Sequence, residues 1–147
     1  MTIMEIGYIV LGFTLMIQSY WDLRYKEIPI MVTAVSGVVG LLLSFIGKRE
    51  WIDVLIAFIP GLCCLGIGRV TRQAIGYGDG FLLCGMAMYI SCRDILSVSM
   101  MAVMMSGVAA LVCIAFQKKK GKDQLPFVPF LAVAWIIYIL VEKGVSI

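Results

Sequence analysis

Asp79 is the residue of this chain whose presence most needs a chemical reason. It lies in Gly76-Tyr77-Gly78-Asp79-Gly80 and is the only charged residue in the run from Gln73 to Cys92. A charge inside a membrane-length apolar segment costs about 2.5 to 3.5 kcal/mol unless it faces a polar cavity or a partner. Glycines permit close backbone approach and positive φ, which would let a substrate strand lie beside the acid. We therefore expect Asp79 to be functional, and its neighbours to position a substrate: Gly76, Gly78 and Gly80.

A second acid, Asp22, ends the first apolar run, in the segment Trp21–Pro29. Two apolar runs separate Asp22 from Asp79, so the chain returns to the same membrane face, and we infer contact between the first and fourth helices. Two carboxylates close together in a low-dielectric site cannot both ionise cheaply, so one keeps a proton. Such a pair can activate water against a peptide carbonyl without a metal or a covalent intermediate.

Helix dipoles suggest which acid holds the proton. Asp79, near a helix N-terminus, is favoured as the anion, and Asp22, near a helix C-terminus, as the protonated partner. The competing interpretation is structural: Asp22 is an interfacial acid beside Arg24 and Lys26, and Asp79 belongs to an ordinary glycine-rich turn. The remaining aspartates are interpreted as solvated interface or loop residues: Asp53, Asp94 and Asp123.

The elements that must position the two acids are predicted to be membrane-spanning helices. The 147 residues are 62% hydrophobic and 14% charged, whereas soluble domains are roughly one-quarter charged. Six apolar runs each approximate the roughly 17 to 25 residues that a helix needs to cross the hydrocarbon core. They are Ile6 to Trp21, Ile28 to Gly47, Val54 to Gly68, Gln73 to Cys92, Ile95 to Gln117 and Gln124 to Val141. We predict an all-α polytopic membrane protein with about six transmembrane helices, one transmembrane domain over residues 1–147 and no soluble domain.

Basic residues predict the orientation. The loops after the first, third and fifth spans hold Arg24, Lys26, Arg69, Arg72, Lys118, Lys119, Lys120 and Lys122; the other side holds Lys48, Arg49, Arg93 and Lys143. By the positive-inside rule the first group is cytoplasmic, both termini are outside, and the acids lie near the cytoplasmic face. The run Lys118–Lys122 can recruit anionic lipid, but a topology signal explains it as well. A net charge of +3 is too small to suggest nucleic acid as a partner.

The five cysteines give no sign of a metal or cofactor site. Their number is odd, none has C-x-x-C spacing, and the chain has no His. A metal site would therefore need carboxylates alone. We interpret the cysteines as small buried apolar residues: Cys63, Cys64, Cys84, Cys92 and Cys113.

Three segments in order resemble the prepilin leader peptidases, the membrane aspartyl proteases with a G-x-G-D motif. Asp22 followed by Ile28-Pro29 resembles the family's first aspartate segment, and Gly76-Tyr77-Gly78-Asp79 resembles its second. Leu125–Ala132 is similar to the proline and phenylalanine segment of its last helix. The likeness covers nearly the whole sequence.

The resemblance implies that Asp22 and Asp79 are the catalytic pair, and that they cleave the short basic leader from pilin or pseudopilin precursors at the cytoplasmic face. Such a substrate enters as a helix, so its scissile backbone must unwind locally. The last segment is implied to position it through Pro126, Phe127 and Pro129. We expect the two prolines to keep the sixth helix bent or mobile, with a role at the helix start as the alternative.

Some features depart from the family pattern. This chain has Phe81 where a basic residue is frequent, and Ile30 where Asn is common. Long members also carry a cytoplasmic domain that methylates the new N-terminus, but about six residues separate the first two spans here. N-methyltransferase activity is therefore not expected.

The leading prediction is thus an aspartic endopeptidase of a type IV pilus or secretion system, with the lipid bilayer and the assembly machinery as further partners. A relative that acts on archaellin-type precursors is a close variant. A small proton-coupled carrier is a different class, but the internal repeats expected of one are not evident. A noncatalytic assembly subunit, in which the acids only pair helices, is the third possibility.

Overall fold

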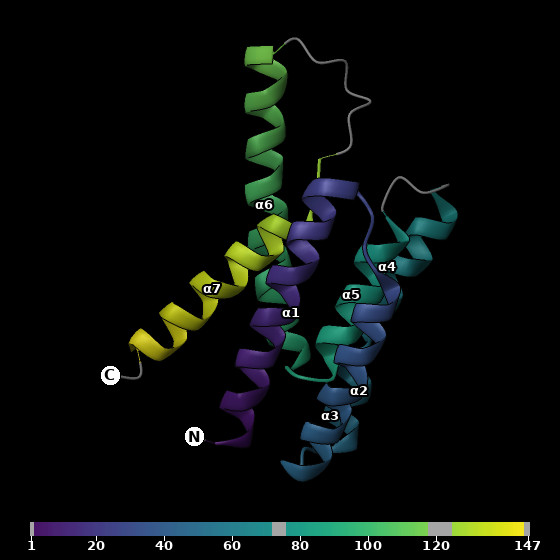
Figure 1. Cartoon of the computed structure of the whole chain (residues 1–147), viewed down its shortest axis with the longest axis vertical. Coiled ribbons are helices and arrows are strands. Elements are labelled where there is room, and N and C mark those ends of the chain that lie inside the picture. The colour runs from purple at the N-terminus through teal and green to yellow at the C-terminus, as the bar shows by residue number, and fades with distance from the viewer. Residues whose placement is uncertain (1, 72–75, 118–124, 146–147) are drawn as a thin grey trace.

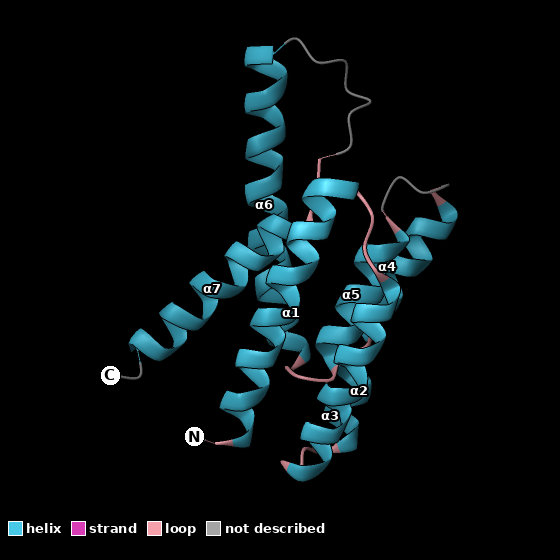
Figure 2. Cartoon of the chain, in the orientation of Figure 1, coloured by secondary structure: helices cyan, strands magenta, loops and turns pink. Residues whose placement is uncertain are grey.

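A computed structural model describes residues 2–71, 76–117 and 125–145, and every regular element in these ranges is a helix (Figure 2). The elements are α1 (Ile3–Tyr25), α2 (Ile30–Ile46), α3 (Trp51–Ala57), α4 (Ile59–Val70), α5 (Tyr77–Ala87), α6 (Cys92–Gln117) and α7 (Val128–Val145). The prediction of an all-α polytopic membrane protein is confirmed. The basic run at 118–122 lies outside the described residues, as do Arg72 and Asp123.

The helices form two packed groups, which meet where α1 packs against α2. Helix α1 packs against α2 and α7, α7 packs against α6, and α5 packs against α2 and α4 (Figure 1). The start of α1 and the end of α7 lie at one end of the bundle, and the α1–α2 linker lies at the other (Figure 1).

The helices differ in their ability to cross a membrane. By length and composition, α1, the combined segment Trp51–Val70 and α6 are long and apolar enough, whereas α2 and α7 are shorter apolar helices. In the described part of the expected fourth span, Gln73 to Cys92, helix α5 has 11 residues. Eleven residues rise about 16 Å, about half of the roughly 30 Å hydrocarbon core. Helix α5 is therefore shorter than the apolar run that predicted it.

Arg49 fixes the place where α5 ends. Its guanidinium donates to the carbonyl oxygen of Ala87 at 3.1 Å and to that of Ile90 at 2.8 Å. These carbonyls lie at and just beyond the C-terminus of α5, where helix carbonyls have no partner within the helix and a cation is favourable. The α2–α3 loop therefore caps α5.

The predicted third span is a bent pair of helices. Helix α3 ends at Ala57 and α4 begins at Ile59, with Pro60 in the first turn of α4. Proline has no N–H to donate to the preceding turn, and its ring crowds that turn. The bend at Phe58 therefore follows from Pro60, which the apolar pattern alone did not reveal.

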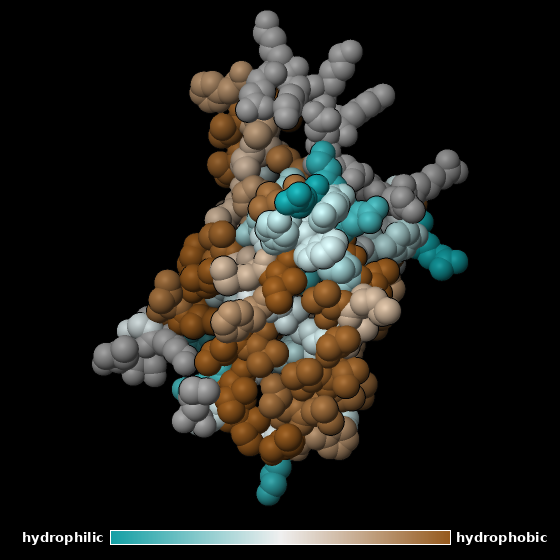
Figure 3. Space-filling view, viewed as in Figure 1, coloured by the Kyte–Doolittle hydropathy of each residue, from teal (hydrophilic) through white to brown (hydrophobic). Residues whose placement is uncertain are grey.

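Large apolar side chains cover much of the surface. Met31, Val70 and Phe116 are all more than 80% exposed. Figure 3 shows apolar side chains over most of one face and a hydrophilic area around the end of α1 and the α1–α2 linker. Soluble monomers rarely expose such large contiguous apolar surface, which is what a lipid-facing helix presents. The surface therefore agrees with a membrane location.

Polar side chains tie α1, α2 and the C-terminal end of α5 together. Gln18 Nε2 donates to Thr33 Oγ1 at 2.8 Å, and the Thr14 and Ser36 hydroxyls are 3.0 Å apart. The Tyr89 hydroxyl, just beyond α5, contacts the Ser36 side chain and donates to the Ser36 carbonyl. Between apolar helices such bonds contribute about 0.6 kcal/mol each and fix their register. They help to set the two predicted acids relative to one another.

Candidate active site

Asp22 lies in the last turn of α1 and is only 7% exposed. It belongs to the buried face of that helix, which consists of Gly7, Leu11, Thr14, Leu15, Gln18 and Asp22. Its Oδ2 accepts a hydrogen bond of 3.0 Å from the backbone N–H of Val128, the first residue of α7. The first N–H groups of a helix have no partner within it and favour an anion. Asp22 therefore acts as a cap supplied to α7 from 106 residues away.

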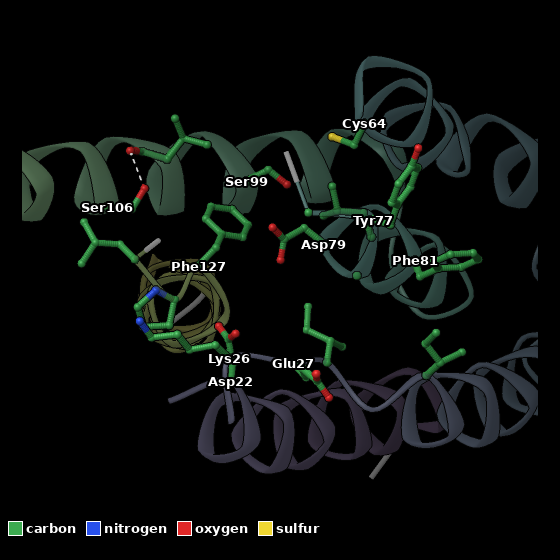
Figure 4. A pocket seen from close by; sticks show the side chains of 18 residues that line it. Asp22, Lys26, Glu27, Cys64, Tyr77, Asp79, Phe81, Ser99, Ser106 and Phe127 are labelled. Carbon is green, nitrogen blue, oxygen red and sulfur yellow. Dashed lines mark hydrogen bonds between the residues drawn. The ribbon is translucent and has the colours of Figure 1, made fainter. Parts of the chain in front are cut away.

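Asp79 lies in the first turn of α5, where Gly76 is the N-cap residue. The side chain is half-buried. Within the described part of the chain, its carboxylate has no hydrogen-bond partner, and Figure 4 shows it directed into a cavity. The two acids thus differ: Asp22 is held by a donor, and Asp79 faces open space.

Both acids line the same cavity of about 830 Å³. Such a volume falls within the roughly 300–1,000 Å³ that is usual for ligand pockets. The expected packing of the first helix on the fourth is replaced by a different arrangement: α2 packs against both α1 and α5, and the two carboxylates face a shared space.

Ile28 joins the two aspartate segments. A Cβ at Gly78 would lie 2.8 Å from Cδ1 and 3.0 Å from Cβ of Ile28, so only glycine lets the α1–α2 linker approach this closely. The close approach to the backbone that was expected at these glycines is therefore present at Gly78, but the neighbour is Ile28 and not a substrate strand. The expected positive φ is absent from the described glycines, because the segment enters a helix at Tyr77 instead of forming a turn.

The predicted substrate-positioning residues fall into two sets. Gly76, Gly78, Pro126 and Phe127 line the cavity, whereas Gly80 and Pro129 are not among the lining residues. Gly80 is buried, and a Cβ there would lie 2.7 Å from the Leu65 side chain, so its small size serves packing between α4 and α5.

The prolines act at the start of α7. Pro126 precedes this helix, and Pro129 is its second residue, where the first N–H groups have no internal partner to lose. Helix α7 runs as one helix from Val128 to Val145. The expectation that the prolines bend the sixth helix is therefore corrected in favour of the alternative, a role at the helix start; that they keep the helix mobile stays a prediction.

Sequence reasoning did not find several residues of the site. Val128, whose N–H binds Asp22, is one of them, and its only signal is its place between Phe127 and Pro129 at a helix start. Other polar residues also line the cavity: Lys26, Glu27, Cys64, Tyr77, Ser99 and Ser106. Ser99 and Ser106 are seven positions apart on α6, which places both on one face of the helix.

The structure gives no candidate metal centre among the residues it describes. No group of three or more His, Cys, Asp or Glu side chains lies close enough together to hold an ion in residues 2–71, 76–117 and 125–145. The described residues of the cavity offer carboxyl groups, hydroxyls, the Lys26 amine and the Cys64 thiol.

Comparison with known proteins identifies the family. The sequence profile of the type IV leader peptidase family matches residues 9–115, which contain both Asp22 and Asp79. The match leaves out Leu125–Ala132, so the likeness of that segment stands on its residues alone. No curated protein and no solved structure matches the chain. Because the profile covers more than half of the sequence, the chain belongs to the type IV leader peptidase family.

Proposed function

We propose that this protein is an aspartic endopeptidase that removes the short leader from type IV pilin-like precursors, with Asp22 and Asp79 as its catalytic pair. Family membership supports a leader peptidase-like protease in general. The observation that carries the aspartic mechanism is the position of both acids on one cavity (Figure 4). These acids come from segments 57 residues apart, and nothing but the fold brings them together.

The hydrogen bond from Val128 supports a division of roles between the acids. A backbone N–H at a helix N-terminus stabilises a carboxylate more than a carboxylic acid, so we assign the negative charge to Asp22. Asp79 has no such donor among the described residues, so we assign the proton to it. This assignment is the reverse of the one that the helix dipoles suggested, in which Asp79 was the anion and Asp22 held the proton. The direct hydrogen bond from Val128 of α7 to Asp22 outweighs the unfavourable effect of the α1 dipole on a charged Asp22.

In the proposed reaction Asp22 takes a proton from water while the water oxygen bonds to the scissile carbonyl carbon. Asp79 gives its proton to the carbonyl oxygen, which yields a diol. The carbon–nitrogen bond then breaks as Asp22 returns its proton to the nitrogen, and one hydroxyl of the diol gives its proton to Asp79. Both acids end in their starting states, and one water is consumed.

Charge at the cavity supports a basic leader as the substrate. Among the described residues that line it are three acids, Asp22, Glu27 and Asp79, and one base, Lys26. With the proton on Asp79, two of these acids are charged. Complementary charge steers and orders a partner more than it tightens binding. The leader would lie beside the α1–α2 linker, and the apolar helix of the precursor would remain in the bilayer. We place the protein in the cytoplasmic membrane, with both termini outside, where it would serve a pilus or secretion machinery.

Co-expression with a candidate prepilin tests the proposal through the size shift of the precursor. We expect cleavage by the wild type and none by Asp22→Asn or Asp79→Asn. The matched control is Asp53→Asn, because Asp53 is an exposed acid in α3 that does not line the cavity; this variant should cleave normally. Wild-type processing by either of the first two variants would remove that residue from the pair. Uptake driven by a pH gradient, without cleavage, would instead indicate a carrier.

A further inference from the structure

Ser99 has a buried hydroxyl without a partner at the wall of the cavity. Three side-chain atoms of the described residues are buried and make no hydrogen bond: Gln18 Oε1, Ser99 Oγ and Trp135 Nε1. Of these three residues, only Ser99 lines the cavity that holds Asp22 and Asp79. A buried hydroxyl left unpaired costs about 1–3 kcal/mol. Such a group in a native structure calls for an explanation, such as a catalytic role or a bound water.

Neighbouring serines of α6 show that Ser99 is a special case. Serines in a helix commonly donate to a carbonyl of the preceding turn. Ser97 does so to the Arg93 oxygen at 3.0 Å, and Ser106 to the Val103 oxygen at 3.0 Å. Ser99 does not, and Figure 4 shows its hydroxyl directed from α6 toward the Asp79 carboxylate. The hydroxyl therefore has no acceptor among the described residues and points to the side on which the proposed acid lies.

We propose that Ser99 is a third catalytic residue, whose hydroxyl donates a hydrogen bond to the oxygen of the scissile carbonyl. This inference rests on the proposed function. As the water oxygen bonds to the carbonyl carbon, negative charge develops on the carbonyl oxygen. Asp79 delivers a proton to that oxygen from α5, and Ser99 stabilises it from α6 without gaining or losing a proton. Donors fixed in advance around such an oxygen are among the largest contributors to catalysis.

The test measures kcat and KM for purified protein in detergent with a prepilin peptide. Because the bond forms fully only in the transition state, Ser99→Ala should lower kcat by about 100- to 1,000-fold and change KM by less than about twofold. Ser99→Thr keeps the hydroxyl and should restore most of kcat. The matched control is Ser97→Ala, whose hydroxyl is used within α6 and does not line the cavity; its kcat should equal that of the wild type.

The outcomes separate this inference from the function on which it rests. Normal kcat in Ser99→Ala, together with an inactive Asp79→Asn, overturns the role of Ser99 and leaves the peptidase intact. A lower melting temperature in Ser99→Ala, with no rescue by Ser99→Thr, shows a structural role and also overturns it. A wild type that cleaves no prepilin overturns the proposed function and this inference with it.

Discussion

The hydrogen bond between Asp22 and Val128 predicts that the two acids differ in their effect on stability although both are needed for activity. Asp22→Ala leaves the buried Val128 N–H without its acceptor, which costs about 1–3 kcal/mol. It also removes the charge at the N-terminus of α7, worth about 0.3–1 kcal/mol. We therefore expect a loss of about 2 kcal/mol in the free energy of unfolding. Asp79→Ala breaks no hydrogen bond among the described residues, and we expect it to cost less than about 0.5 kcal/mol.

Thermal unfolding in detergent, followed by tryptophan fluorescence, measures the difference. For a chain of this size about 2 kcal/mol corresponds to a melting temperature lower by roughly 4–8 °C. Asp22→Asn is the control, because its amide oxygen can still accept from Val128; it should melt close to the wild type and still be inactive. Equal melting temperatures for Asp22→Ala and Asp79→Ala would refute the capping role of Asp22.

Two further predictions concern packing and topology. A Cβ at Gly61 would lie 2.5 Å from Cys84 Sγ and 2.8 Å from its backbone nitrogen, so Gly61→Ala should destabilise the fold by about 1–3 kcal/mol. Gly66→Ala, in the same helix with nothing within 4 Å, should be neutral or stabilising in the same denaturation assay. Topology can be tested with single cysteines at two exposed positions, Lys48→Cys in the α2–α3 loop and Lys26→Cys in the α1–α2 linker, each in a cysteine-free background. An impermeant maleimide added to intact cells should label Lys48→Cys and spare Lys26→Cys. The opposite labelling pattern would place the cavity at the outer face.

Composition and motif spacing were sufficient to predict the fold class and the helix end at which each acid lies. Apolar runs predict helices because a backbone in lipid must satisfy its own hydrogen bonds. Their order then predicts the face at which the chain emerges. Asp22 indeed falls in the last turn of α1 and Asp79 in the first turn of α5. The match to the family over residues 9–115 supports the resemblance that the two aspartate segments suggested.

Local features that depend on distant residues were predicted less well. The shortness of α5 depends on Arg49, which reaches its carbonyls from a loop about 40 residues earlier. Gly80 was expected to position substrate, but Leu65 of α4 occupies the space beside it. In both cases the apolar pattern indicated a helix and contained no information about the neighbour that shapes it.

The sequence by itself determined that this protein is helical, that it resides in a membrane, and that the two acids lie at the same end of the bundle, one at the end of its helix and the other at the start. These properties follow from the hydrophobicity of each segment and from the order of the segments along the chain, and neither depends on contacts between distant residues. Only the tertiary structure decided that the acids share a cavity, that Val128 binds one of them and that Ser99 points toward the other. Such contacts join residues on different helices, and packing between helices selects them among many arrangements of equal hydrophobicity.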